Sequence, residues 1–149
     1  MSNKFLVLAT MSLLSSSAFS STLTCESYYQ YAGERVNLVL EITQHGPPMT
    51  AKLSIPSSPN SVLSGPIPTK GESAMLIGET SQSRIFLSGI SQIKQATGSF
   101  LYRKYDVNIS KDEFEKAGPF IIHIMSAEIS YAPEGSDTST SMQFTCRKK

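Results

Sequence analysis

The sequence predicts an all-β, mainly antiparallel fold: a single-domain β-sandwich or barrel with one short helix and one disulfide. Apolar and polar residues alternate along several segments, as they do in strands that bury one face. Residues that favour turns (Gly, Pro, Asn and Ser) separate these segments. The two cysteines lie near opposite ends of the chain, at Cys25 and Cys146.

The clearest alternation runs from Arg35 to Thr43, where every second residue, beginning with Val36, is aliphatic. This period of two predicts a strand with one buried face. The other segments rich in β-branched or aromatic residues predict strands at Thr22–Tyr29, Met49–Ile55, Ser73–Glu79, Arg84–Ile90, Ser99–Ile109, Pro119–Tyr131 and Ser139–Arg147.

A short helix is predicted over 110–117, with Lys111 to Ala117 as its body. Ser110 and Glu113 have the spacing of a capping box, in which each side chain satisfies a free backbone N–H of the first turn. Gly118 and Pro119 should end the helix, because glycine tolerates the left-handed conformation and proline cannot continue the ladder.

The last two strands should form a hairpin, because the residues from Ala132 to Asp137 favour a turn. On the final strand, Met142, Phe144 and Cys146 share one face, which places the disulfide at the edge of the core. On its partner, the alternate set is predicted as the core face; its members are Ile121, His123, Met125, Ala127, Ile129 and Tyr131.

Residues 1–20 resemble a cleavable signal peptide. Lys4 supplies a positive charge, Phe5 to Leu14 are mostly apolar, and Ala18-Phe19-Ser20 offers small residues at the −3 and −1 positions. The apolar stretch of about ten residues is shorter than the roughly twenty that a helix needs to cross a bilayer. We therefore expect a secreted or periplasmic protein with no transmembrane segment in the mature chain.

In an oxidising compartment, Cys25 and Cys146 should pair. A lipid-bearing Cys25 is the alternative, but the residues before it do not fit a lipoprotein signal, and it would leave Cys146 unpaired. Zinc would need more ligands than these cysteines and scattered histidines provide. We expect no metal and no cofactor.

The mature residues, 21–149, are enough for one β-rich domain. The chain holds 13 basic and 12 acidic residues, and loss of Lys4 would leave 12 of each. Nucleic-acid binders usually carry a basic face, and no basic run precedes the last three residues. Nucleic acid is therefore not an expected partner.

The stretch from Gln44 to Ser73 is rich in proline and serine and holds six of the eight prolines. Because proline removes a donor from the hydrogen-bond ladder, we interpret residues 44–73 as a loop-rich region around one strand. Long loops on a rigid sheet often carry binding sites, although a solvated connection explains the composition equally well.

Catalytic patterns are sparse, and we assign no catalytic residue. His45 and His123 are the candidate imidazole bases, but His45 lies in a presumed turn and His123 lies on an apolar strand face. No nucleophile elbow and no glycine-rich phosphate loop occurs. The chain is uncertain as an enzyme, and the pattern leans against it.

Tyrosines beside cations form the candidate binding set. Such rings offer a large contact area and a directed hydroxyl, which suit proteins, peptides and sugars, but tyrosine is also a common strand residue. The candidates are Tyr28, Tyr29, Tyr31, Tyr102, Arg103 and Tyr105.

Three functions remain open, and no motif is specific enough to name a family. The preferred one is a non-enzymatic binding module for an unknown protein, peptide or glycan. The alternatives are a hydrolase using His45 or His123 and a structural subunit whose sheet edges join identical copies. The oligomeric state is not predicted.

Overall fold

The computed structural model describes residues 19–31, 33–44, 48–60, 66–129 and 139–149. Residues 1–18 of the predicted signal peptide and the tip of the predicted last hairpin lie outside these ranges. The first strand begins at Phe19, two residues before the predicted cleavage point.

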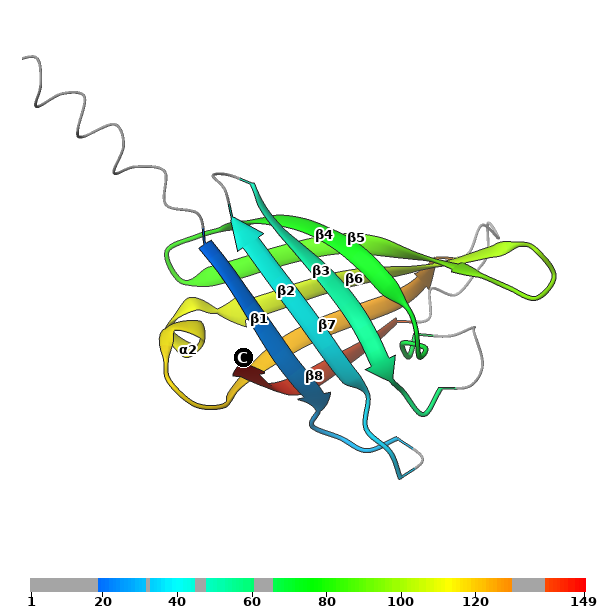
Figure 1. Cartoon of the computed structure of the whole chain (residues 1–149), viewed down its shortest axis with the longest axis horizontal. Helices are drawn as coiled ribbons and strands as arrows, with labels where there is room; N and C mark the ends of the chain where they lie inside the picture. Colours follow the sequence, from blue (N-terminus) through cyan, green and yellow to red (C-terminus); the bar gives the residue numbers. More distant parts are fainter. Residues whose placement is uncertain (1–18, 32, 45–47, 61–65, 130–138) are drawn as a thin grey trace, which may run out of the picture.

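The fold is a closed antiparallel barrel in which the strands follow one another in sequence order, and the first strand pairs with the last (Figure 1). Every strand predicted from the sequence is present, and closure decides between the two predicted architectures. The elements are β1 (Phe19–Ser27), β2 (Asn37–Gln44), β3 (Met49–Ser57), β4 (Ser73–Thr80), β5 (Arg84–Lys94), β6 (Phe100–Ser110), α2 (Lys111–Glu115), β7 (Phe120–Ile129) and β8 (Ser139–Lys148).

The predicted disulfide closes the seam of the barrel. Cys25 of β1 pairs directly with Cys146 of β8, and their Cα atoms are 4.0 Å apart. The cross-link joins residues 121 positions apart, and both cysteines are buried. In the chain-entropy model, a link of this span disfavours the unfolded state by up to about 4–5 kcal/mol.

The barrel interior is filled by side chains from all eight strands. Leu23, Leu40, Leu53, Leu76 and Phe144 are among the buried residues that form one apolar core. Only glycine fits at position 78, where β4 meets β5, because a Cβ on Gly78 would lie 1.7 Å from the carbonyl oxygen of Phe86. The backbones of the two strands can therefore approach closely.

Helix α2 covers one end of the barrel, whereas the β5–β6 hairpin extends at the opposite end (Figure 1). Phe114 of α2 is buried and meets Phe120 edge to face, with ring centroids 6.1 Å apart. The helix ends at Glu115, two residues earlier than predicted, and Gly118 has the expected positive φ of 97°.

The predicted capping box is wrong. Ser110 makes no side-chain cap hydrogen bond. The N–H of Lys111 instead donates to the carbonyl oxygen of Ser83, and the Glu113 carboxylate accepts from Lys116 Nζ at 2.9 Å. Contacts with the β4–β5 turn thus replace the local cap.

The predicted core face of β7 is also wrong. Phe120, Ile122 and Ile124 point inward and are buried, whereas Ile121 and Met125 point outward and are 43% and 50% exposed. Both faces of this strand are apolar, so alternation alone could not decide which face is buried. His123 shares the outer face and is exposed.

Candidate functional site

Two regions depart from the usual distribution of side chains: a charged cluster inside the barrel and an apolar face outside it. The interior cluster is centred on Glu72, in the β3–β4 connection just before β4. Glu72 is the last residue of a turn over residues 69–72, in which its N–H donates to the carbonyl oxygen of Thr69. Gly71 has a positive φ of 86° in this turn, which glycine adopts without strain.

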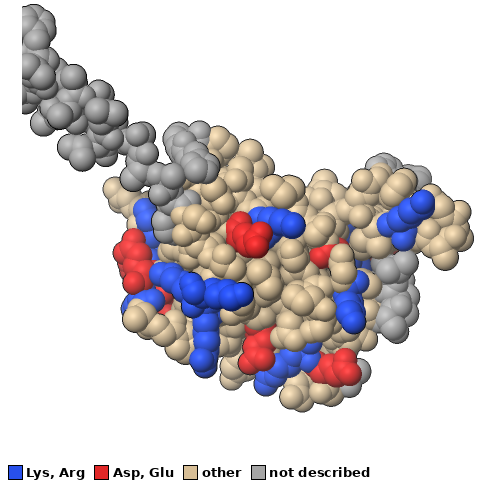
Figure 2. All heavy atoms as spheres, viewed as in Figure 1, with Lys and Arg blue, Asp and Glu red and all other residues tan. Residues whose placement is uncertain are grey.

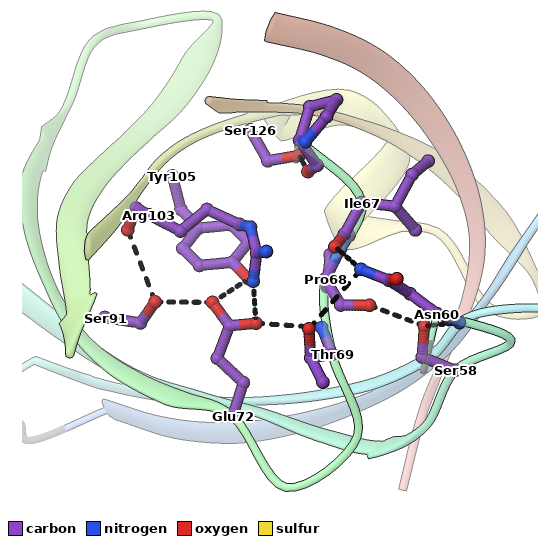
Figure 3. Close-up of polar contacts among 11 residues, drawn as sticks. Ser58, Asn60, Ile67, Pro68, Thr69, Glu72, Ser91, Arg103, Tyr105 and Ser126 are labelled. Carbon is purple, nitrogen blue, oxygen red and sulfur yellow. Dashed lines mark hydrogen bonds and ion pairs between the residues drawn. The ribbon is translucent and has the colours of Figure 1, made fainter. Parts of the chain in front are cut away.

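Both oxygens of the buried Glu72 carboxylate accept hydrogen bonds (Figure 3). Ser91 Oγ and the Tyr105 hydroxyl donate to Oε1, the latter at 2.6 Å. Arg103 Nη1 and the backbone N–H of Thr69, at 2.9 Å, donate to Oε2. The carboxylate therefore ties the β3–β4 connection to β5 and β6.

The same connection crosses the barrel interior, as Figure 3 shows for Ile67, Pro68 and Thr69. The Asn60 amide donates to the carbonyl oxygen of Ile67 at 2.7 Å, and Ser126 Oγ donates to that of Pro66 at 2.6 Å. Within the described part of the chain, no buried polar side-chain atom lacks a partner. The polar cluster is a satisfied part of the interior.

The electrostatics of the cluster favour a neutral tyrosine beside a charged pair. Burial, and then the neighbouring Glu72 carboxylate, raise the pKa of Tyr105 far above its ordinary value. Arg103 and Glu72 form a fully buried ion pair. The Tyr105 hydroxyl therefore stays protonated in the ordinary pH range and acts as a hydrogen-bond donor to Glu72.

The candidate binding residues do not form one exposed surface. Arg103 and Tyr105 are fully buried inside the barrel, so the expectation that they are surface contacts is wrong. Tyr102 is half-buried on the outside of β6. The alternation of Leu101, Val107 and Ile109 with outward residues could have placed residues 103 and 105 on the inner face.

The tyrosines after β1 have different environments. Tyr28 and Tyr29 are exposed and meet edge to face with centroids 5.1 Å apart, whereas Tyr31 packs partly against the core. Arg35 holds this connection by donating to the carbonyl oxygens of Ser27 and Tyr28. Two of the candidate tyrosines are thus available at the surface.

The second region is the outer surface of β4, β5 and β7, which the sequence did not indicate as a site. Its large apolar side chains are between 43% and 66% exposed. We name this set the outer apolar face; it comprises Met75, Ile77, Phe86, Ile90, Ile121 and Met125. No exposed large apolar side chain occurs among the described side chains of β1, β2 and β3.

Figure 2 shows the opposite surface, over β1–β3, where basic and acidic side chains are interspersed among neutral ones. Glu41 and Lys52, for example, are exposed and occupy directly paired positions on β2 and β3. Exposed apolar residues are ordinary when scattered, whereas a patch of them commonly marks an interaction site. The apolar residues of β4 and β5 are neighbours, and the outward residues of β6, among them Lys104 and Asp106, separate them from Met125 of β7. The two sides of the barrel therefore differ in what they can bind.

A shallow groove lies on the outer apolar face. One row of paired positions crosses four strands in the order Ile77, Ser88, Asp106 and Met125, so that two small polar residues lie between two large apolar ones. The next row contributes Glu79, Phe86, Asn108 and His123. We name this hollow the outer groove; these eight residues line it together with Gly78, Leu87, Val107 and Ser141.

The histidines do not form a catalytic arrangement in the described part of the chain. His45 lies outside the described residues, and His123 makes no hydrogen bond there to a serine or to an acidic side chain. Among the described residues, no group of three or more His, Cys, Asp or Glu side chains could hold a metal ion.

No helix in the described ranges is long and apolar enough to cross a membrane. Comparisons of the chain with family models, curated proteins and solved structures gave no match in any of the three.

Proposed function

We propose that the chain is an exported, non-enzymatic binding module, secreted or periplasmic, whose protein or peptide partner docks on the outer apolar face. The observation that carries this proposal is the exposure of six large apolar side chains on β4, β5 and β7, whereas the described side chains of strands β1–β3 include none. Removing such side chains from water would contribute about 25 cal/mol per Å² of apolar area.

The satisfied interior supports docking on the outside. Barrels that bind small ligands inside leave an interior cavity for them. Here the β3–β4 connection and the Glu72 cluster occupy one end of the interior, and Phe114 covers the other. A partner on the outer apolar face would contact side chains that lie outside the barrel core.

Export is part of the proposal. The N-terminal pattern around Lys4 and the Ala18-Phe19-Ser20 site supports it. The Cys25–Cys146 disulfide is compatible with it, because disulfides persist in oxidising compartments.

Face-dependent capture tests the function. The oxidised protein is immobilised and exposed to native envelope extract and surrounding fluids, and bound proteins are quantified by mass spectrometry. A variant with Ile77→Thr, Phe86→Thr and Met125→Gln removes apolar area but retains polar side chains on each strand. The matched control carries Thr24→Gln, Glu26→Gln and Glu41→Gln, which are exposed on β1 and β2 across the barrel from β5.

We expect specific partners on the parent protein and the control but not on the outer-face variant. Equal capture by all three proteins, or no capture by the parent, would overturn the proposal. Gel filtration of the parent at high concentration reports whether the partner is a second copy of the chain.

A further inference from the structure

We infer that the outer groove accepts an arginine side chain from a partner segment whose neighbouring residues are aliphatic. This inference rests on the proposed function and names the chemistry of the partner. It is carried by the shape of the groove, its charge and the aromatic ring within it.

The shape follows from the strand register. Ile77 and Met125 are well exposed on β4 and β7, whereas Ser88 and Asp106 lie between them and are half-buried. The hollow has a volume of about 470 Å³, which is large enough for a long side chain and part of its backbone. Aliphatic neighbours of the inserted residue would cover the apolar walls.

The charge of the lining is acidic. Glu79 and Asp106 are the charged side chains among the described residues that line the groove, and no Lys or Arg lines it. Glu79 forms no ion pair with a described residue. The lining itself therefore favours a cation over an anion, and Glu79 is the carboxylate that an added cation can reach without displacing a described partner.

Two cations border the groove and are already directed at its acceptors. Lys104 Nζ lies 3.6 Å from Asp106 Oδ2, and Arg84 Nη1 donates to Asn108 Oδ1 at 3.0 Å. The Lys104–Asp106 pair is about half exposed, and such pairs contribute little to stability. An incoming cation can replace Lys104 at Asp106 with little loss.

Phe86 favours arginine over lysine. A guanidinium can stack on an aromatic face and donate two parallel hydrogen bonds to a carboxylate, whereas an ammonium acts as a point charge. Phe86 shares the groove with both carboxylates and is about half exposed. The groove therefore offers a guanidinium both an aromatic ring for stacking and a carboxylate for hydrogen bonding.

Other occupants fit less well. A purely apolar segment would remove Asp106 and Glu79 from water without a new partner, which is costly. A second copy placed with groove against groove would bring the same carboxylates together. An acidic segment would be repelled by the carboxylates of Glu79 and Asp106.

Three synthetic peptides of equal length test the inference: alternating leucine and arginine, leucine and glutamate, and serine and arginine. Backbone amide shifts in NMR spectra of the oxidised protein report the site and the Kd. The leucine–arginine peptide should shift residues 77–79, 86–88 and 106–108 and bind at least tenfold more tightly than either other peptide. Added salt should weaken this binding.

The decisive variant carries Glu79→Gln and Asp106→Asn, and its matched control carries Glu26→Gln and Glu41→Gln on the opposite face. The first should bind the leucine–arginine peptide at least tenfold more weakly, and the control should bind as the parent does. Unchanged affinity in the first variant, equal affinity for the leucine–glutamate peptide, or no shift at millimolar peptide overturns the inference. If face-dependent capture survives that outcome, the proposed function stands and only the arginine chemistry fails.

Discussion

The buried cluster around Glu72 and the outer apolar face reverse the usual distribution in opposite ways. The first places charges inside the barrel, and the second places large apolar side chains outside. Hydrogen bonds from Ser91, Tyr105 and Thr69 complete the first, so it contributes to the native fold. The side chains of the second remain between 43% and 66% exposed, so the fold buries only part of their apolar area and a partner that covered them would bury the rest.

This contrast predicts that changes inside the barrel alter stability and changes outside alter binding. Glu72→Gln should have the largest effect, because it leaves the buried Arg103 guanidinium beside a neutral amide. We expect a loss of about 3–5 kcal/mol in the free energy of unfolding. Urea denaturation measures it.

Glu79→Gln is the matched change on the outside and should alter the free energy of unfolding by less than about 0.5 kcal/mol. A loss below about 1 kcal/mol for Glu72→Gln would show that the interior cluster is not the stabilising element that its geometry indicates.

The next effect is the response to alkaline pH. Burial, together with the Glu72 carboxylate, raises the pKa of Tyr105 above that of an unfolded tyrosine, which is about 10. Above pH 10 the unfolded chain loses this proton while the folded protein keeps it. The contribution of Tyr105 to the free energy of unfolding is therefore fully present below pH 10, and it should fall by about 1.4 kcal/mol per pH unit above pH 10.

Urea denaturation between pH 8 and 11 measures this slope, and Tyr105→Phe is the control. The variant should be less stable at pH 8, because the Glu72 carboxylate loses a donor, but it should lack this part of the alkaline slope. Parallel pH profiles of the two proteins would contradict the assignment.

The sequence was sufficient to predict the strands, the helix and the disulfide, because alternation, turn residues and cysteine count are local signals. It was insufficient for β7, where Ile121 and Ile122 are both apolar and only closure of the barrel selects the inner one. It also could not place Glu72, whose partners on β5 and β6 lie 19 to 33 residues away. Alternation along β6 was a usable signal for Arg103 and Tyr105.

The misassigned face of β7 is also the part of the chain that points to function. A strand that is apolar on both sides has more apolar surface than one barrel interior can bury. On β7 the inner side is used by the core, whereas Ile121 and Met125 remain in water. The ambiguity in the pattern and the candidate binding surface therefore have the same origin.

A small expected effect on stability, that of changing the outer apolar face itself, separates the two regions most sharply. The variant with Ile77→Thr, Phe86→Thr and Met125→Gln should change the free energy of unfolding by less than about 1 kcal/mol in total, since these side chains lie outside the core. Urea denaturation of this variant and of the opposite-face control should give overlapping curves. A loss of several kcal/mol would mean that the outer apolar face stabilises the barrel itself, and its exposure would no longer indicate a partner. Unchanged stability with lost capture would leave binding as the reason that these side chains lie in water.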